Sequence, residues 1–280
     1  DTLYAAITAA WFEIGVYKQG ETPEYNFTIS SLFPFTQDQH TKEYVYFFPK
    51  PFVPAPRTPH MPEILPELIK KYKRIQYYDY NFFSNYISGQ PLMENPNSVA
   101  PLKGEHMTLR HINPHFISST VRQRVQIPRD FSDAEPFYME ELRFTKGSGL
   151  YCIIQYDEEQ KEKQQAKVRA ALDLLQENGI GTDRNIGYGR FSYEEGRISD
   201  WHHEPSSYFV NLSLFCPGSQ AEAQAALRYS LIKRGGWISH HQHYNHRKKS
   251  LYMFSEGGVF HFPKEASNSY LIKGDSAIDI

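Results

Sequence analysis

The residues best suited to chemistry lie in the segment GIGTDRNIGYGRF, residues 179–191. It contains four glycines within eleven positions, and two arginines, Arg184 and Arg190, stand among them. Glycine permits positive φ and lets a ligand come close to the main chain. Exposed N–H groups in such a loop can bind phosphate oxygens, and guanidinium groups can clamp the same oxygens. The segment therefore suits a phosphate-bearing ligand, although a mobile connector between two elements would have a similar composition. The candidate contact residues here are Gly179, Gly181, Thr182, Arg184, Asn185, Gly187, Gly189 and Arg190.

The elements on either side of this loop limit its possible ligands. Residues 158–178 predict a helix, with Val168, Ala171 and Leu175 on one face and an end at Asn178-Gly179. Residues 190–194 predict a strand. Glycine motifs that bind nucleotide cofactors have the reverse order, because they follow a strand and open a helix. We therefore expect no nucleotide cofactor, and no other cofactor is indicated.

A second basic element is the alternating segment VRQRVQI, residues 121–127. Arg122 and Arg124 share one face of the predicted strand, and Val121 and Val125 share the other, which we expect to be buried. Residues two apart on one face are separated by about 7 Å, close to the spacing of successive phosphates. Arg129 follows directly and is a third candidate RNA contact. Acidic residues that could instead pair with these arginines are Asp130, Asp133 and Glu135.

The net charge of −2 counts against a free-standing RNA-binding protein, which usually has a basic surface. The basic residues are nevertheless concentrated locally, so the total hides patches of positive potential. Lys248 and Lys249 are further candidate RNA contacts within one such cluster. The whole cluster is Arg228, Lys233, Arg234, Arg247, Lys248 and Lys249.

Histidines offer two alternative kinds of chemistry. His111, His115 or a member of HHQHYNH, residues 240–246, could act as a general base on an RNA 2′-hydroxyl. His241, His243 and His246 also have spacings compatible with metal ligation, but no Cys, Asp or Glu lies within that cluster. We favour a solvated loop whose histidines form hydrogen bonds, and we expect no metal.

The remaining pattern predicts an α+β protein with helices packed on antiparallel sheets. Residues 49–62 contain six prolines and predict an extended loop, while the polar residues 84–118 indicate a long insertion. The aromatic segment YYDYNFF, residues 77–83, predicts a core strand with an interface role, although its rings could also stack on RNA bases. Further predicted helices are 2–14, 63–74 and 219–229, and further predicted strands are 44–48, 137–144, 149–156, 207–215, 250–255 and 258–262.

Composition places few other limits on the protein. The 280 residues suffice for one large or two ordinary domains, and no apolar run reaches the length of a membrane span. Cys152 and Cys216 belong to no CxxC pair and predict two buried thiols in a reducing compartment. We therefore expect a cytoplasmic protein that makes no membrane contact.

Several segments resemble a known family. GIGTDRNIGYGRF resembles the glycine-rich loop of the RAMP superfamily of CRISPR proteins. The start Asp1-Thr2-Leu3-Tyr4 and the segments RGGWIS (234–239), RKKSLYMFSEGGVF (247–260) and KGDSAIDI (273–280) resemble, in the same order, the handle-binding, Cas5-like subunit of type III-A (Csm) effector complexes. The stretch 15–118 carries the least of this resemblance.

The resemblance implies two ferredoxin-like (RRM-like) modules, at residues 1–136 and 137–280. The first strand of the first module would precede residue 1, and residues 84–136 would hold a thumb-like hairpin that bends the guide RNA. It further implies a non-catalytic subunit that caps the foot of the complex and grips the 5′ handle of the guide RNA. The implied partners are the large polymerase-type subunit and the adjacent backbone RAMP subunit. The alternative is a RAMP-type endoribonuclease that processes the guide precursor with a histidine general base.

Overall fold

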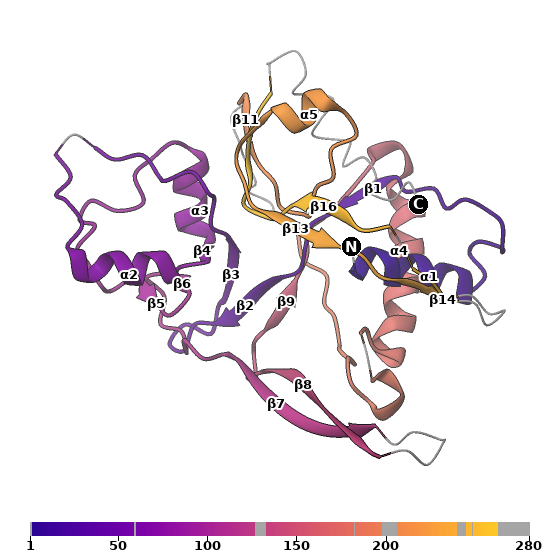
Figure 1. Ribbon diagram of the computed structural model, residues 1–280. Helices are drawn as coiled ribbons and strands as arrows, with labels where there is room; N and C mark the ends of the chain where they lie inside the picture. The colour runs from indigo at the N-terminus through magenta and orange to yellow at the C-terminus, as the bar shows by residue number, and fades with distance from the viewer. Residues whose placement is uncertain are drawn as a thin grey trace. The chain divides into compact units, whose positions relative to one another are not determined.

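The computed structural model confirms a mixture of helices and small sheets (Figure 1). It describes residues 2–58, 60–126, 133–181, 183–197, 206–239, 245–247 and 249–262. The chain divides into two compact units, of which the first comprises 1–31, 51–53 and 152–280, and the second 32–50 and 54–151. The predicted module boundary at 136/137 falls inside strand β8 (Glu135–Phe144). The division into two ferredoxin-like modules stays a prediction.

The first unit is built on two helices, α1 (Thr2–Glu13) and α4 (Lys161–Asn178), whose apolar faces pack together. The predicted helical periodicities are confirmed, because Ile7, Trp11 and Val168 are buried in one cluster. The indole Nε1 of Trp11 donates a hydrogen bond of 2.8 Å to the carbonyl of Lys167, which links the two helices. Strand β1 (Phe27–Ile29) pairs antiparallel with β10 (Ile154–Tyr156) beside them, and the short helix η1 (Glu158–Gln160) precedes α4.

The rest of the first unit consists of short antiparallel strands around Phe254, Phe260 and Phe262, which are buried together. Strand β17 lies between β11 and β12. Strand β13 pairs with β16, and β14 pairs with β15. The elements are η2 (Arg184–Ile186), β11 (Tyr208–Val210), α5 (Gln220–Gln224), β12 (Ala226–Arg228), β13 (Leu231–Arg234), β14 (Trp237–Ser239), β15 (Asn245–Arg247), β16 (Leu251–Phe254) and β17 (Val259–His261).

The second unit contains a six-stranded sheet in the order β5-β6-β4-β3-β2-β9. Only β4 and β6 run parallel to each other. Phe47 and Phe116 stack in its core with ring centroids 5.9 Å apart. The elements are β2 (Phe33–Gln37), β3 (Tyr44–Pro49), α2 (Pro66–Arg74), β4 (Tyr77–Asp79), α3 (Tyr80–Ile87), β5 (Leu102–Lys103), β6 (His106–Met107) and β9 (Gly149–Tyr151).

Strands β7 (Ile117–Gln126) and β8 form a long two-stranded hairpin that runs away from the sheet of the second unit (Figure 1). Its ladder pairs Ile117 with Phe144 at one end and Gln126 with Glu135 at the other. The hairpin starts well after residue 84 and continues past 136, so the predicted thumb range overlaps it without matching its bounds.

The structure corrects several sequence-based predictions of secondary structure. Residues 84–118 are not an inserted loop, because β5 and β6 join the central sheet and Ile112 and Phe116 are buried. The segment 77–83 is half strand and half helix, since Asp79 caps α3 by accepting a hydrogen bond from the N–H of Phe82. The predicted helix 219–229 ends early and continues as β12, and residues 190–194 form no strand.

Of the helices in the described ranges, none carries an apolar run long enough for a bilayer. Cys152 and Cys216 are free thiols of intermediate exposure, so the prediction that both are buried is wrong. Partial burial raises the pKa of Cys152 to about 11. This thiol is therefore protonated and unreactive near neutral pH.

Candidate nucleic-acid interface

The glycine-rich loop is closed at its base by the main chain. The N–H of Gly179 donates a hydrogen bond of 2.7 Å to the carbonyl of Leu175, which ends α4. The N–H of Ile180 donates one of 3.0 Å to the carbonyl of Gly189, on the returning segment. Ile180 and Phe191 both pack against the cluster of α1 and α4. The two ends of the loop are therefore held together on a fixed apolar base.

The four glycines divide into two kinds. Gly179 and Gly189 have φ values of 77° and 73°, and an added Cβ would strike backbone atoms: the carbonyl oxygen of Tyr188, at 2.6 Å, and the main chain of Ile180. Gly181 and Gly187 also have positive φ, 99° and 91°, but nothing lies within 4 Å of an added Cβ. The first pair thus allows the backbone to close, and the second pair leaves open space beside the main chain.

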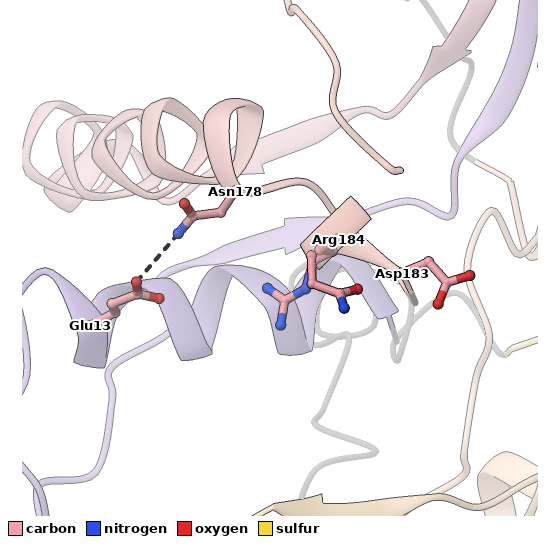
Figure 2. A pocket seen from close by; sticks show the side chains of 6 residues that line it. Glu13, Asn178, Asp183 and Arg184 are labelled. Atoms are coloured by element: carbon pink, nitrogen blue, oxygen red, sulfur yellow. Dashed lines mark hydrogen bonds between the residues drawn. The ribbon is translucent and has the colours of Figure 1, made fainter. Parts of the chain in front are cut away.

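The tip of the loop is a tight turn around η2. Asp183 adopts a left-handed conformation with φ 61°, and its carbonyl accepts hydrogen bonds from the N–H groups of Ile186 and Tyr188. An open pocket of about 580 Å³ lies beside this turn (Figure 2). Figure 2 shows the side chains of Arg184 and Asp183 pointing in different directions, and the side chain of Asn178 donating a hydrogen bond of 3.3 Å to Glu13 of α1. The lining residues are Glu13, Asn178, Gly181, Asp183, Arg184 and Asn185.

The loop arginines are available to a ligand. Arg184 and Arg190 are exposed, and neither forms an ion pair with any residue that the structure describes. Asn185, Gly181 and Gly187 are exposed as well. The structure thus brings the predicted residues of this segment into one loop, except Thr182, which lies outside the described residues.

The segment after the loop is held by side chains and forms no ladder. The hydroxyl of Tyr193 donates a hydrogen bond of 2.7 Å to Asp173 on α4, and Glu195 forms an ion pair with Arg169 on the same helix. Hydrogen bonding to the Arg169 guanidinium lowers the pKa of Glu195. These contacts keep the segment along α4, which explains why the predicted strand at 190–194 is absent.

The hairpin holds its arginines differently. Arg122 Nε lies 2.9 Å from a carboxylate oxygen of Glu141 on the opposite strand, and Arg124 and Arg143 approach the same carboxylate at 3.6 and 4.0 Å. The Glu141 side chain is only 5% exposed. Sequence reasoning missed this partner, because Glu141 lies across the ladder and only the register places it diagonally opposite Arg122.

The valine side of the hairpin is not buried by this chain, so that prediction is wrong. Val121 and Val125 are 63% and 54% exposed, and Tyr138 and Leu142 on the same side are 70% and 61% exposed. A two-stranded hairpin has no second layer to cover either face. Each side therefore faces outward: one carries the arginines around Glu141, and the other is largely apolar.

Other predicted residues are less informative. Lys249 is exposed just before β16, whereas Arg129 and Lys248 lie outside the described residues, as does most of the histidine cluster 240–246. His111 stacks on His40 with ring centroids 4.2 Å apart. Within the described ranges, no three His, Cys, Asp or Glu side chains converge on a possible metal position.

Asp38 lies beneath this histidine pair. Its buried carboxylate accepts hydrogen bonds from the backbone N–H groups of His40, Thr41 and His111, and these bonds lower its pKa to about 2. The carboxylate therefore stays ionised and fixes the backbone that carries both imidazoles.

Comparisons with known proteins agree with this architecture. A family model for the CRISPR Csm4 C-terminal domain matches residues 204–268. The CRISPR system Cms protein Csm4 of Streptococcus thermophilus is 22% identical over 275 residues, which cover 93% of this chain and 79% of the relative. The protein of the same name from Thermococcus onnurineus strain NA1 is 25% identical over 244 residues, covering 82% of this chain and 69% of the relative.

Solved structures extend the comparison to the fold. A chain of a Csm3-Csm4 subcomplex in the type III-A CRISPR-Cas interference complex matches with a TM-score of 0.65 and 18% identity, covering 94% of this chain and 86% of that chain. A chain of a Csm1-Csm4 cassette in complex with cA4 matches with a TM-score of 0.52 and 18% identity, covering 93% and 79%. The chain therefore has a fold similar to that of chains in these Csm3-Csm4 and Csm1-Csm4 assemblies. In sequence the chain is similar to two Csm4 proteins, and its residues 204–268 match the Csm4 C-terminal domain model.

Proposed function

We propose that this protein is a non-catalytic subunit that binds the 5′ handle of the guide RNA through its glycine-rich loop and caps the foot of the effector complex. The observation that carries the proposal is the combination of two exposed arginines, which have no ion-pair partner among the described residues, with two glycines that have open space beside them. The loop base is already closed by main-chain contacts. A phosphate backbone could thus approach a preformed loop without a large ordering cost.

The chemistry of the loop suits RNA phosphates. Positive-φ glycines turn successive N–H groups outward, and arginine guanidinium groups bind phosphate oxygens in pairs. The open pocket beside Arg184 also contains Asn185, whose amide can donate to or accept from a ribose or base edge. Glu13 on the rim repels phosphate, so the RNA path should favour the Arg184 side of the pocket.

The test is a double variant, Arg184→Ala with Arg190→Ala, assayed by filter binding of handle RNA over a series of salt concentrations. Losing two phosphate contacts should weaken binding and lower the slope of log K against log salt by about 1.4. The matched control removes two exposed lysines of α4, Lys161→Ala with Lys163→Ala, which should leave the slope nearly unchanged. An unchanged slope of log K against log salt in the arginine variant would contradict the proposal.

The proposed partners are the large polymerase-type subunit and the adjacent backbone RAMP subunit. Support comes from the similar solved chains, which were crystallised as Csm3-Csm4 and Csm1-Csm4 assemblies. The outward apolar side of the hairpin, with Val121, Tyr138 and Leu142 exposed, is the kind of surface that such subunits bury. Co-purification of tagged chain with each partner subunit tests this part of the proposal.

A second candidate function is RNA cleavage by a histidine pair. The stacked rings of His40 and His111, supported by the buried Asp38, are the observation that favours it. One imidazole could take the 2′-hydroxyl proton while the other protonates the leaving oxygen. Incubation of purified protein with guide precursor in the presence of a chelator decides between the candidates. Cleavage that His111→Ala abolishes would establish the nuclease, and intact precursor supports the non-catalytic subunit.

A further inference from the structure

Strands β13 and β16 present an aromatic ring and a cation together on one exposed face. Lys233 and Tyr252 are directly opposite each other in the ladder, so their side chains share a face. The Lys233 Nζ lies 6.0 Å from the centroid of the Tyr252 ring. Tyr252 is 62% exposed although it lies within the strand pair.

The neighbours of Tyr252 on this face differ in size along the ladder. On one side Phe254 is buried, with the ring of Tyr229 packed edge-on at 4.9 Å. On the other side stand Gly235 and Ser250, where a Cβ added to the glycine would meet the serine hydroxyl at 3.0 Å. Tyr252 is thus backed by an aromatic cluster at one end, and only small residues lie at the other.

The sequence around strands β13 and β16 carries charge of one sign. From Ala223 to Ser255 the sequence contains no Asp or Glu, but it holds six Lys and Arg residues in a chain of net charge −2. Lys233 and Lys249 are exposed among the described residues of this stretch. Exposed rings combined with cations suit single-stranded nucleic acid, because bases stack on rings while phosphates meet cations.

We propose that Tyr252 and Lys233 form a stacking site for one base of single-stranded RNA, with Lys233 on the adjoining phosphate. This inference rests on the proposed function and adds a contact that reads the base, separate from the phosphate contacts of the glycine-rich loop. An uncharged protein partner would gain nothing from Lys233 and the other cations of this stretch, so the charge favours RNA as the occupant.

The test uses the full chain with two fluorescent probes: single-stranded oligoadenylate, and a ribose-phosphate oligomer of the same length without bases. Tyr252→Leu should weaken oligoadenylate binding at least about fivefold, the lower end of what one stacked base contributes, and should not affect the abasic oligomer. Tyr252→Phe, which keeps the ring, should bind both probes like the unchanged chain. Lys233→Gln should weaken both probes and lower the salt slope by about 0.7.

A matched control is Tyr208→Leu, which removes another exposed ring of the same unit, at 59% exposure, and should not affect binding. If the unchanged chain binds neither probe nor handle RNA, the proposed function itself fails. If it binds oligoadenylate and Tyr252→Leu binds it equally well, only the stacking site is overturned. Loss of co-purification with the large subunit in that same variant would then assign this face to a protein contact.

Discussion

The glycine-rich loop and the β7–β8 hairpin both present two arginines, but they hold them in opposite ways. In the loop the backbone is fixed, by the Ile180–Gly189 hydrogen bond and by glycines that admit no side chain, while Arg184 and Arg190 have no ion-pair partner among the described residues. In the hairpin the arginines are anchored to Glu141, whereas most of the backbone ladder around them is exposed on both sides.

This difference shows two ways in which the fold presents arginines at the surface. A backbone that is already closed loses little conformational entropy when a ligand binds, and its cations can form new ion pairs with phosphates. A hairpin without a second layer has little core of its own, so shared ion pairs limit the spread of its arginine rotamers. We expect the loop to respond mainly to changes that disturb its backbone, and the hairpin to changes of charge.

The largest expected effect is at the loop base. Gly189→Ala should cost about 3 kcal/mol of unfolding free energy, because it combines positive φ with a collision against the main chain of Ile180. Gly187→Ala should cost only about 1 kcal/mol, since the added Cβ meets nothing within 4 Å and the strain comes from the positive φ of 91° alone. Urea unfolding of both variants measures the difference. Equal losses would mean that the loop base is not closed as described.

The next effect lies at the root of the hairpin, where His106 is 7% exposed and its ring centroid lies 4.8 Å from that of Phe116, next to β7. Burial lowers the pKa of His106 from 6.5 to about 4. Below about pH 6.5 the His106 imidazole binds a proton in the unfolded chain but not in the folded chain. The stability of the folded state therefore falls as the pH drops toward 4. For such a shift the linkage loss between pH 7 and pH 5 is about 2 kcal/mol.

The measurement for this prediction is urea unfolding at pH 7 and pH 5, with His106→Phe as the control. The phenylalanine keeps a ring among Phe47, Tyr77 and Phe116 and does not titrate. It should therefore lose less stability on acidification than the unchanged chain. The same pH sensitivity in both proteins would place its origin elsewhere.

A smaller effect separates the two roles of the hairpin arginines. Arg122→Ala with Arg124→Ala should weaken guide binding and cost about 1 kcal/mol of stability, because the buried Glu141 carboxylate loses two of the arginines beside it. Adding Glu141→Gln should restore most of the stability without restoring RNA affinity.

Filter binding and urea unfolding of both variants measure the two quantities. The control is Lys70→Ala with Lys71→Ala on α2, whose lysines are exposed. Intact affinity in the arginine variant would leave only a structural role for the pair.

The smallest stability effect is expected on the apolar side of the hairpin. Leu142→Lys should change the unfolding free energy by less than about 0.5 kcal/mol, because the side chain is already 61% exposed. It should nevertheless reduce co-purification with neighbouring subunits of the complex, since it places a charge on the proposed contact surface. Thr120→Lys, on the arginine side of the ladder, is the matched control. Assembly that tolerates Leu142→Lys would argue that this side faces solvent.

Sequence reasoning was most successful where periodicity acts over short distances. The apolar spacing in residues 2–14 and 158–178 predicted helices whose buried residues include Ile7, Trp11 and Val168. The segment 190–194 has a strand-like sequence, yet contacts with Asp173 and Arg169 on α4 hold it instead. Residues 77–83 change from strand to helix because Asp79 can cap the following turn. The structures of these two segments depend on partners distant in the chain or on a single helix cap. Hydrophobic periodicity predicts neither of these.

The candidate site shows the same division. Glycine content, basic residues and their order along the chain are properties of the sequence, and they were enough to select residues 179–190 and the arginines of β7. Only the tertiary structure separates Gly179 and Gly189, which close the backbone, from Gly181 and Gly187, which leave it open. It alone places Glu141 beside Arg122 and Lys233 beside Tyr252. The physical reason is that a residue type sets what a group can do locally, whereas its partner depends on ladder register and on chain return, which bring together residues far apart in sequence.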